Sequence, residues 1–227
     1  MADMNALLNA HTNRDAQLSP DVGFVAGVPP EELGAQKGVS SDCVQREGYE
    51  WYVVRVTYNR IKAACEKALS LGIVTYVPTH YVMKLVAGKK KRVCEPLLPN
   101  IVFIYATREL AVSLVHGSAE RPSFVKFYLN RTLPVERNGK YPPMTIPYEI
   151  MMNFIRLTGT ESVHVRAVSE GQCRYKSGDM VRVTAGEFRG IIGRVARIAG
   201  QQRVVVEMKG LCLVATAYIP SDFIEKV

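Results

Sequence analysis

The chain has 227 residues, of which 48% are hydrophobic and 22% charged, and it carries a net charge of +8. This is ordinary globular composition, with enough length for one or two domains. No apolar run approaches the ~18 residues of a transmembrane helix and the N-terminus lacks a signal-peptide pattern, so we expect a cytoplasmic protein with no membrane partner.

The cysteines and the distribution of charge bear on metal binding, on the redox compartment and on the class of partner. The five cysteines are scattered without a C-x-x-C pair, and the four histidines lie far from them in sequence. This argues against a zinc site and for a reducing compartment. The net charge is −4 over residues 1–47, +8 over 48–173 and +4 over 174–227. A folded region with this positive charge is expected to bind nucleic acid or an acidic protein surface. A soluble basic domain without such a partner fits the charge equally well.

The N-terminal quarter predicts a tail followed by a strand and a helix. Residues 1–47 are punctuated by glycine and proline, so we expect disorder, with at most a short helix over residues 4–10. Residues 51–56 are aromatic and β-branched and predict a buried strand. Asn59 is a suitable N-cap for a helix whose apolar residues repeat from Ile61 to Leu69, and Gly72 supplies its stop.

The middle of the chain alternates between strands and short helices. Strands are predicted at residues 73–77, 81–86, 101–105 and 124–128, and Thr107 can cap a helix over 109–116. Pro147 suits the first position of a helix with an apolar face that ends at Gly159. Gly88 is followed by four consecutive cations, which predict a basic loop at the tip of a hairpin: Lys89, Lys90, Lys91 and Arg92.

From residue 176 the pattern becomes purely β, after an expected linker at residues 160–175. Strands are predicted at Val181 and Val183, at 195–198, 204–208 and 213–219, and near Phe223. Three glycines stand in the pattern V-x-V-x-x-G-x-F-x-G-x-x-G-x-V, and glycine lets a strand turn or bulge tightly. We therefore expect an α+β domain over residues 48–159 and a small closed β-barrel over 176–227.

No motif supports catalysis. The sequence has no G-x-S-x-G, P-loop, H-E-x-x-H or G-x-G-x-x-G, and its carboxylates and histidines are dispersed. We expect a protein that is not an enzyme and that uses neither a metal nor a cofactor.

Two sets of motifs together resemble a known family. The C-terminal glycine pattern resembles the KOW module of transcription and translation factors. With Trp51-Tyr52-Val53-Val54, Val77-Pro78-Thr79 and the Pro99-Asn100 turn before a strand, residues 49–227 resemble the NusG family of transcription elongation factors. The Pro-Asn turn and residues 124–127 are similar to the paralogue RfaH. Residues 203–206 and 213–220 are similar to the UpxY group, NusG-like antiterminators of capsular polysaccharide operons.

The resemblance implies a NusG N-terminal α/β sandwich domain that binds RNA polymerase, followed by an SH3-like KOW barrel. In the family a hydrophobic cavity grips the polymerase clamp, and the matching residues are Tyr52, Leu98, Pro99, Ile101 and Phe103. For Phe103 we weigh a place in the core equally. Leu98 and Ile101 stand where RfaH-like proteins carry aromatic residues.

The resemblance also implies that basic residues of the first helix and the hairpin meet the non-template DNA strand or nascent RNA: Arg60, Lys62, Lys67, Lys89, Lys90, Lys91 and Arg92. The alternative is a solvated helix face and a soluble loop. The sequence-reading positions of RfaH correspond to Thr57 and Lys67 and are not preserved, so we do not expect the same DNA preference.

In the KOW domain, Phe188 and Arg189 are the candidates for contact with a second protein, a ribosomal protein or a Rho-like factor. The alternative is that Phe188 plugs the barrel mouth. The glycines and the run Val204–Val206 disfavour helix, so we expect a constitutive barrel. The resulting hypothesis is a monomeric antitermination factor that suppresses pausing and termination in capsular or surface polysaccharide operons. The alternatives are a general NusG-type factor and a ribosome- or RNA-binding KOW protein.

Overall fold

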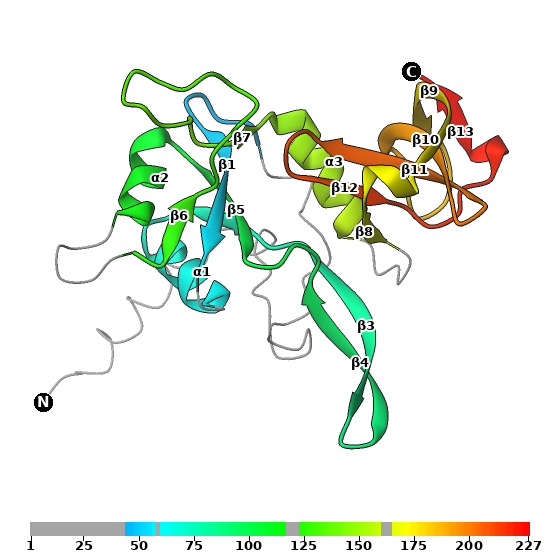
Figure 1. Ribbon diagram of the computed structural model, residues 1–227, viewed down its shortest axis with the longest axis horizontal. Coiled ribbons are helices and arrows are strands. Elements are labelled where there is room, and N and C mark those ends of the chain that lie inside the picture. The colour runs from blue at the N-terminus through cyan, green and yellow to red at the C-terminus, as the bar shows by residue number, and fades with distance from the viewer. Residues whose placement is uncertain (1–43, 58–59, 117–122, 160–164) are drawn as a thin grey trace, which may run out of the picture.

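The protein is described from a computed structural model, which covers residues 44–57, 60–116, 123–159 and 165–227 (Figure 1). The expected helix over residues 4–10, the cap at Asn59 and most of the expected tail lie outside this range. Within it, strands predominate over helices, and the mixed α+β class predicted from the sequence is confirmed.

An antiparallel sheet of five strands forms the first half of the fold. Its order is β2-β5-β1-β6, and β7 also pairs with β1. The strands are β1 (Glu50–Val56), β2 (Val74–Tyr76), β5 (Ile101–Ala106), β6 (Val125–Phe127) and β7 (Thr145–Ile146). The central strand β5 is buried along its whole length, as expected when both faces of a sheet are covered.

Helices cover the two faces of this sheet. On one face, α1 (Ile61–Ser70) and α2 (Arg108–Val115) pack their apolar residues against Tyr52, Val54 and Ile104. On the other face, α3 (Tyr148–Thr158) packs Phe154 against Phe103, with ring centroids 5.5 Å apart. The alternation of β1 side chains between the two faces follows from the period of two in a strand. The predicted N-cap of α2 is confirmed, because the Thr107 side chain accepts a hydrogen bond from the Leu110 amide.

A two-stranded hairpin projects from this body, made of β3 (Thr79–Val86) and β4 (Lys89–Pro96) (Figure 1). Val86 pairs with Lys89, so the turn consists of Ala87 and Gly88 alone. Both turn residues have positive φ, 50° and 77°. This is the geometry of a type I′ turn, whose twist matches that of the strands it joins.

The C-terminal sheet is antiparallel and has six strands in the order β13-β9-β10-β11-β12-β8. They are β8 (Arg166–Val168), β9 (Arg174–Val183), β10 (Ile192–Ile198), β11 (Gln201–Met208), β12 (Cys212–Ala215) and β13 (Ile224–Lys226), with short 3₁₀ turns η1 (Glu170–Gln172) and η2 (Ser221–Phe223). Strand β8 comes from the segment expected to be a linker, and it pairs with β12. Gly193 is needed in β10 because a Cβ there would collide with the carbonyl oxygen of Val205.

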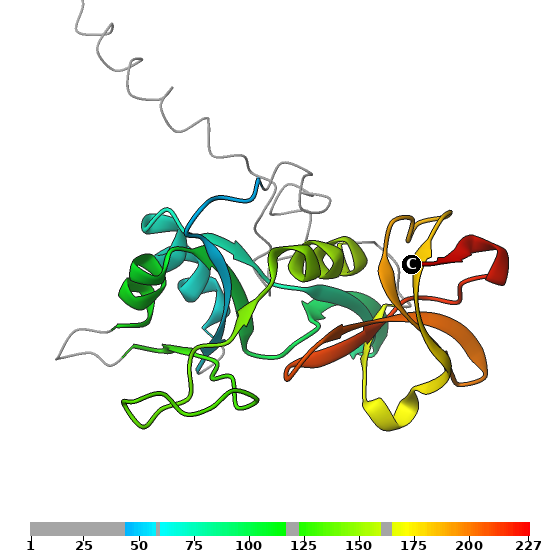
Figure 2. The same cartoon turned by 90° about the horizontal axis from the view of Figure 1, so that it is seen from above.

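The two sheets share one apolar core. A single buried cluster runs from Trp51 and Phe103, through Met151 and Phe154 of α3, to Phe188 and the inner residues of the C-terminal sheet. Both views place α3 between the two sheets (Figures 1 and 2). The turn between β11 and β12 also reaches the first sheet, because a Cβ on Gly210 would lie 3.0 Å from the Met144 methyl carbon.

Candidate functional site

The residues predicted to line one polymerase-binding cavity do not all come together. Tyr52 and Phe103 are buried on opposite faces of the first sheet, Tyr52 against α1 and α2 and Phe103 against α3. Tyr52 is adjacent to Val53 and Phe103 pairs with Val53, so the two side chains must point in opposite directions. The structure therefore does not bring Tyr52 and Phe103 into one cavity, and Phe103 lies in the core. Their contact with a polymerase stays a prediction.

The remaining three residues of that set lie together at the turn into β5. Pro99 is exposed, Leu98 is half-buried against the shared core, and Ile101 is 8% exposed. Asn100 takes a positive φ of 61°, and the Ile101 amide donates to the Leu98 carbonyl at 3.3 Å. Leu98 and Pro99 are thus held at the surface by a tight, hydrogen-bonded turn.

The cations of the first helix differ in their availability. Lys62 is exposed. The Arg60 guanidinium lies 4.3 Å from the centroid of the Phe124 ring, a cation–π contact that leaves the residue exposed. The Lys67 ammonium instead donates to the Leu114 carbonyl at 2.7 Å and to the His116 carbonyl at 3.4 Å. Lys67 therefore caps the C-terminal end of α2 and is already engaged.

The four consecutive cations predicted to form a loop lie on strand β4. All four are exposed, and the register with β3 assigns them to alternate faces of the hairpin. Lys90 and Arg92 share one face with Met83 and Leu85, and Lys89 and Lys91 share the other with Val86 and Lys84. The loop prediction is wrong because the two-residue turn ends at Gly88, and a ribbon exposed on both faces can carry lysine at every position.

The two candidate contact residues in the KOW-like segment, Phe188 and Arg189, differ in burial. Phe188 is only 3% exposed and belongs to the shared apolar core, whereas Arg189 is exposed. The interpretation of Phe188 as an exposed contact is therefore wrong, because the ring packs inside the shared core. The chain turns beside it, where the Arg189 amide donates to the Gly186 carbonyl at 3.2 Å and the Ile191 amide donates to the Phe188 carbonyl at 3.0 Å.

A groove of about 330 Å³ lies between α3 and the C-terminal sheet. On the helix side it is lined by Ile150, Asn153 and Arg156, and on the sheet side by Ile192 and Val206, among others. Asn153 crosses the junction: its amide nitrogen donates to the Ile192 carbonyl at 2.6 Å, and its oxygen accepts from the Ile192 amide at 2.9 Å. No sequence pattern predicts this contact, because a half-buried asparagine in a helix has no periodic pattern.

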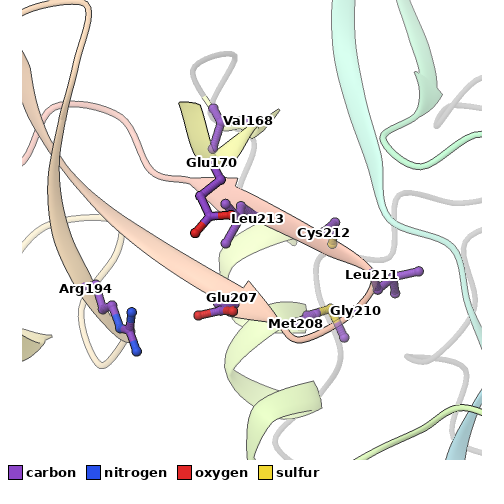
Figure 3. A pocket seen from close by; sticks show the side chains of 9 residues that line it. All are labelled: Val168, Glu170, Arg194, Glu207, Met208, Gly210, Leu211, Cys212 and Leu213. Atoms are coloured by element: carbon purple, nitrogen blue, oxygen red, sulfur yellow. The ribbon is translucent and has the colours of Figure 1, made fainter. Parts of the chain in front are cut away.

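A second hollow of about 330 Å³ is lined by residues of β8, η1, β10, β11 and β12 (Figure 3). Its charged lining residues are Glu170, Arg194 and Glu207. Burial raises the pKa of the Cys212 thiol in its lining to about 12, so this cysteine stays protonated at neutral pH.

Other perturbed groups are also explained by burial. Burial raises the pKa of the Cys65 thiol on α1 to about 11. Burial, and then the hydrogen bond from its hydroxyl to the Glu50 carboxylate, raise the pKa of Tyr52. Among the described residues, no three His, Cys, Asp or Glu side chains are grouped so that they could hold a metal ion. In that same part of the chain, no helix combines the length and apolar character needed to cross a membrane.

Comparison with known proteins gives one family match, in the first part of the chain. Residues 49–154, just under half of the chain, match the family model described as transcription termination factor NusG. A solved structure titled "Domain interaction in Thermotoga maritima NusG" is 19% identical, with a TM-score of 0.37, over 79% of this chain and 97% of that one. The comparison with curated proteins gave no match. The stretch that matches the NusG family model thus contains the first sheet, the projecting hairpin, α1, α2 and the first part of α3.

Proposed function

We propose that this protein is a cytoplasmic, monomeric transcription elongation factor that binds RNA polymerase and suppresses pausing and termination. The observation that carries the proposal is the NusG family domain at residues 49–154, with a basic hairpin at its surface. A factor that binds the elongating form of the polymerase better than the paused form shifts the population toward elongation. This role needs binding surfaces and no reactive groups.

For the polymerase contact we propose the turn before β5, with Leu98 and Pro99 as its accessible apolar residues. Burial of apolar area at roughly 25 cal/mol per Å² supplies affinity, less the cost of association. We expect Leu98→Asp to weaken binding to the polymerase clamp, because it places a charge in an apolar contact. Leu69→Asp is the matched control, because Leu69 is 66% exposed on α1, on the opposite face of the sheet.

For the nucleic-acid contact we propose the hairpin cations together with Arg60 and Lys62. The slope of log K against log salt is negative, and each phosphate that a cation neutralises makes it steeper by about 0.9 on duplex DNA or 0.7 on single strands. Lys67 is left out because its ammonium caps α2. We expect Lys67→Ala to leave the salt slope unchanged while Lys62→Ala reduces it, and equal slopes for both variants would contradict this assignment.

For the C-terminal sheet we propose a second protein partner, a ribosomal protein or a Rho-like factor, contacted by the exposed Arg189. The finer proposal is that the protein acts in capsular or surface polysaccharide operons, which is supported by the resemblance of residues 203–206 and 213–220 to the UpxY group. A transcript map of a deletion strain beside its parent tests it: reduced distal transcripts confined to such operons support specialisation, and a genome-wide change supports a general NusG-type factor.

The deciding experiment is an elongation assay with purified polymerase and the full chain. We expect a shorter dwell time at pause sites, and loss of that effect with Leu98→Asp but not with Leu69→Asp. The proposal would be refuted if the protein did not bind the polymerase and left pausing and termination unchanged. Co-sedimentation with ribosomes in place of polymerase binding would favour the alternative, a ribosome- or RNA-binding KOW protein.

A further inference from the structure

The outer half of the β3–β4 hairpin displays aliphatic side chains that nothing in the described structure covers. Leu85 is 72% exposed, Met83 64% and Val86 41%. They lie on the outer half of β3, in a ribbon that projects from the body (Figure 1). An exposed group of aliphatic residues on a projecting element marks an interaction surface.

Cations surround these aliphatic residues in a fixed arrangement. On one face Leu85 lies directly opposite Lys90, and Met83 lies opposite Arg92. On the other face, Lys84, Lys89 and Lys91 gather near the same end. The acidic residue of the hairpin, Glu95, lies toward its base and pairs with Lys84. Lys84 is thus neutralised by Glu95, and the outer half presents aliphatic residues beside the four cations of β4.

The ribbon has the stiffness and reach to act as an arm. Its type I′ turn follows the natural twist of the strands, and eight residues at about 3.4 Å each give a length of roughly 27 Å. The two strands carry four unbroken cations along β4, a pattern complementary to the phosphates on either side of a DNA groove. A two-stranded ribbon is also narrow enough to enter such a groove.

We propose that the β3–β4 hairpin is an arm for duplex DNA, in which the cations grip phosphates and Leu85 wedges between base pairs and bends the helix. This deepens the nucleic-acid contact of the proposed function and rests on it. Leucine and methionine are side chains that can partly unstack a base step and kink the duplex when cations hold the flanking backbone. Leu85 is the most exposed of the three aliphatic residues and lies opposite a lysine, which fits this role.

The side chains of the hairpin favour duplex over single-stranded DNA. Single strands are bound mainly by stacking bases on aromatic rings. Tyr81 is the only Phe, Tyr or Trp of the hairpin, it is half-buried, and the Arg92 guanidinium lies 3.8 Å from its ring centroid. The ring is therefore already covered on one side, and the exposed apolar groups are aliphatic wedges and not stacking platforms.

The test measures affinity and bending separately, with the full chain and a short duplex that carries a donor and an acceptor dye at its ends. Wild type should bind the duplex more tightly than either single strand and raise the energy transfer between the dyes. Leu85→Ala should return the transfer to that of free DNA with at most about a tenfold loss of affinity. Lys89→Ala with Lys91→Ala should reduce the salt slope by about 2.

Matched controls separate the arm from general effects. Leu69→Ala removes a leucine of similar exposure from α1 and should change neither readout. Leu85→Met keeps an aliphatic wedge and should keep the bend. The inference would be overturned if the protein bound the duplex without bending it, or preferred a single strand. It would also be overturned if the protein bound vesicles of anionic lipid and Leu85→Ala weakened that binding instead. If one of these occurs while the protein still shortens polymerase pauses, the arm is wrong and the proposed function stands.

Discussion

The junction between α3 and the C-terminal sheet depends on the Asn153 side chain. Its amide makes two hydrogen bonds to the backbone of Ile192 and so pairs with β10 as a neighbouring strand would. We expect Asn153→Ala to weaken the docking of the sheet on the helix. Losing two hydrogen bonds at about 1 kcal/mol each removes about 2 kcal/mol of stability. The better helix propensity of alanine offsets roughly 0.5 kcal/mol of this loss. The net loss of about 1.5 kcal/mol is about tenfold in the docking equilibrium.

Hydrogen exchange at the Ile192 amide, followed by NMR, measures this loss directly. We expect protection to fall about tenfold in Asn153→Ala. Asn153→Asp keeps the size of the side chain but sets a carboxylate oxygen against the Ile192 carbonyl, so its loss should be at least as large. Arg156→Ala, exposed on the same helix, is the control and should change protection by less than a factor of about two. Unchanged protection in both Asn153 variants would refute the assignment.

Three further predictions concern stability. Ala199 has a φ of 50° beside Gly200 in the β10–β11 turn, so Ala199→Asn should raise the unfolding free energy by about 0.5 to 1 kcal/mol, because asparagine tolerates this conformation better; a lower melting temperature would contradict it. Phe188→Ala should cost about 3 to 5 kcal/mol in urea unfolding, because the ring is buried, whereas Arg189→Ala should leave stability unchanged and affect only partner binding; equal losses would contradict the separation. Burial raises the pKa of Cys65 to about 11, and the neutral thiol is favoured in the folded state. The stabilisation is therefore complete below the unfolded pKa of about 8.5 and is lost as pH rises toward 11; a Cys65→Ala variant with the same decline between pH 9 and 11 would exclude this thiol as a cause.

Much of the fold could be predicted because local patterns and tertiary packing agree. The helix beginning at Ile61 follows from apolar residues at helical spacing, and the structure places it at Ile61–Ser70 with those residues buried. The buried strand over 101–105 was equally clear, since an unbroken aromatic and β-branched run is typical of a strand covered on both faces. The cap at Thr107 is a local hydrogen bond and needs no distant partner.

The candidate site was predicted less well because it depends on which face each side chain occupies. Tyr52 and Phe103 are both apolar strand residues, and only the register of β1 with β5 separates them by a sheet. Lys62 and Lys67 both lie on the first helix, yet Lys67 reaches a carbonyl that lies 47 residues further along the chain. Neither distinction follows from spacing within one segment.

The sequence by itself determined the mixed class, most strands and helices, the basic character of the hairpin and the glycine pattern of the C-terminal strands. These are set by backbone conformational preferences and by short-range periodicity, which act within a few residues. Tertiary structure alone decided that the four cations line both faces of a ribbon, that Phe188 is core and that Asn153 joins the two sheets. Such features arise when segments far apart in the chain meet, because burial and long-range hydrogen bonding are properties of the folded arrangement and not of any local pattern.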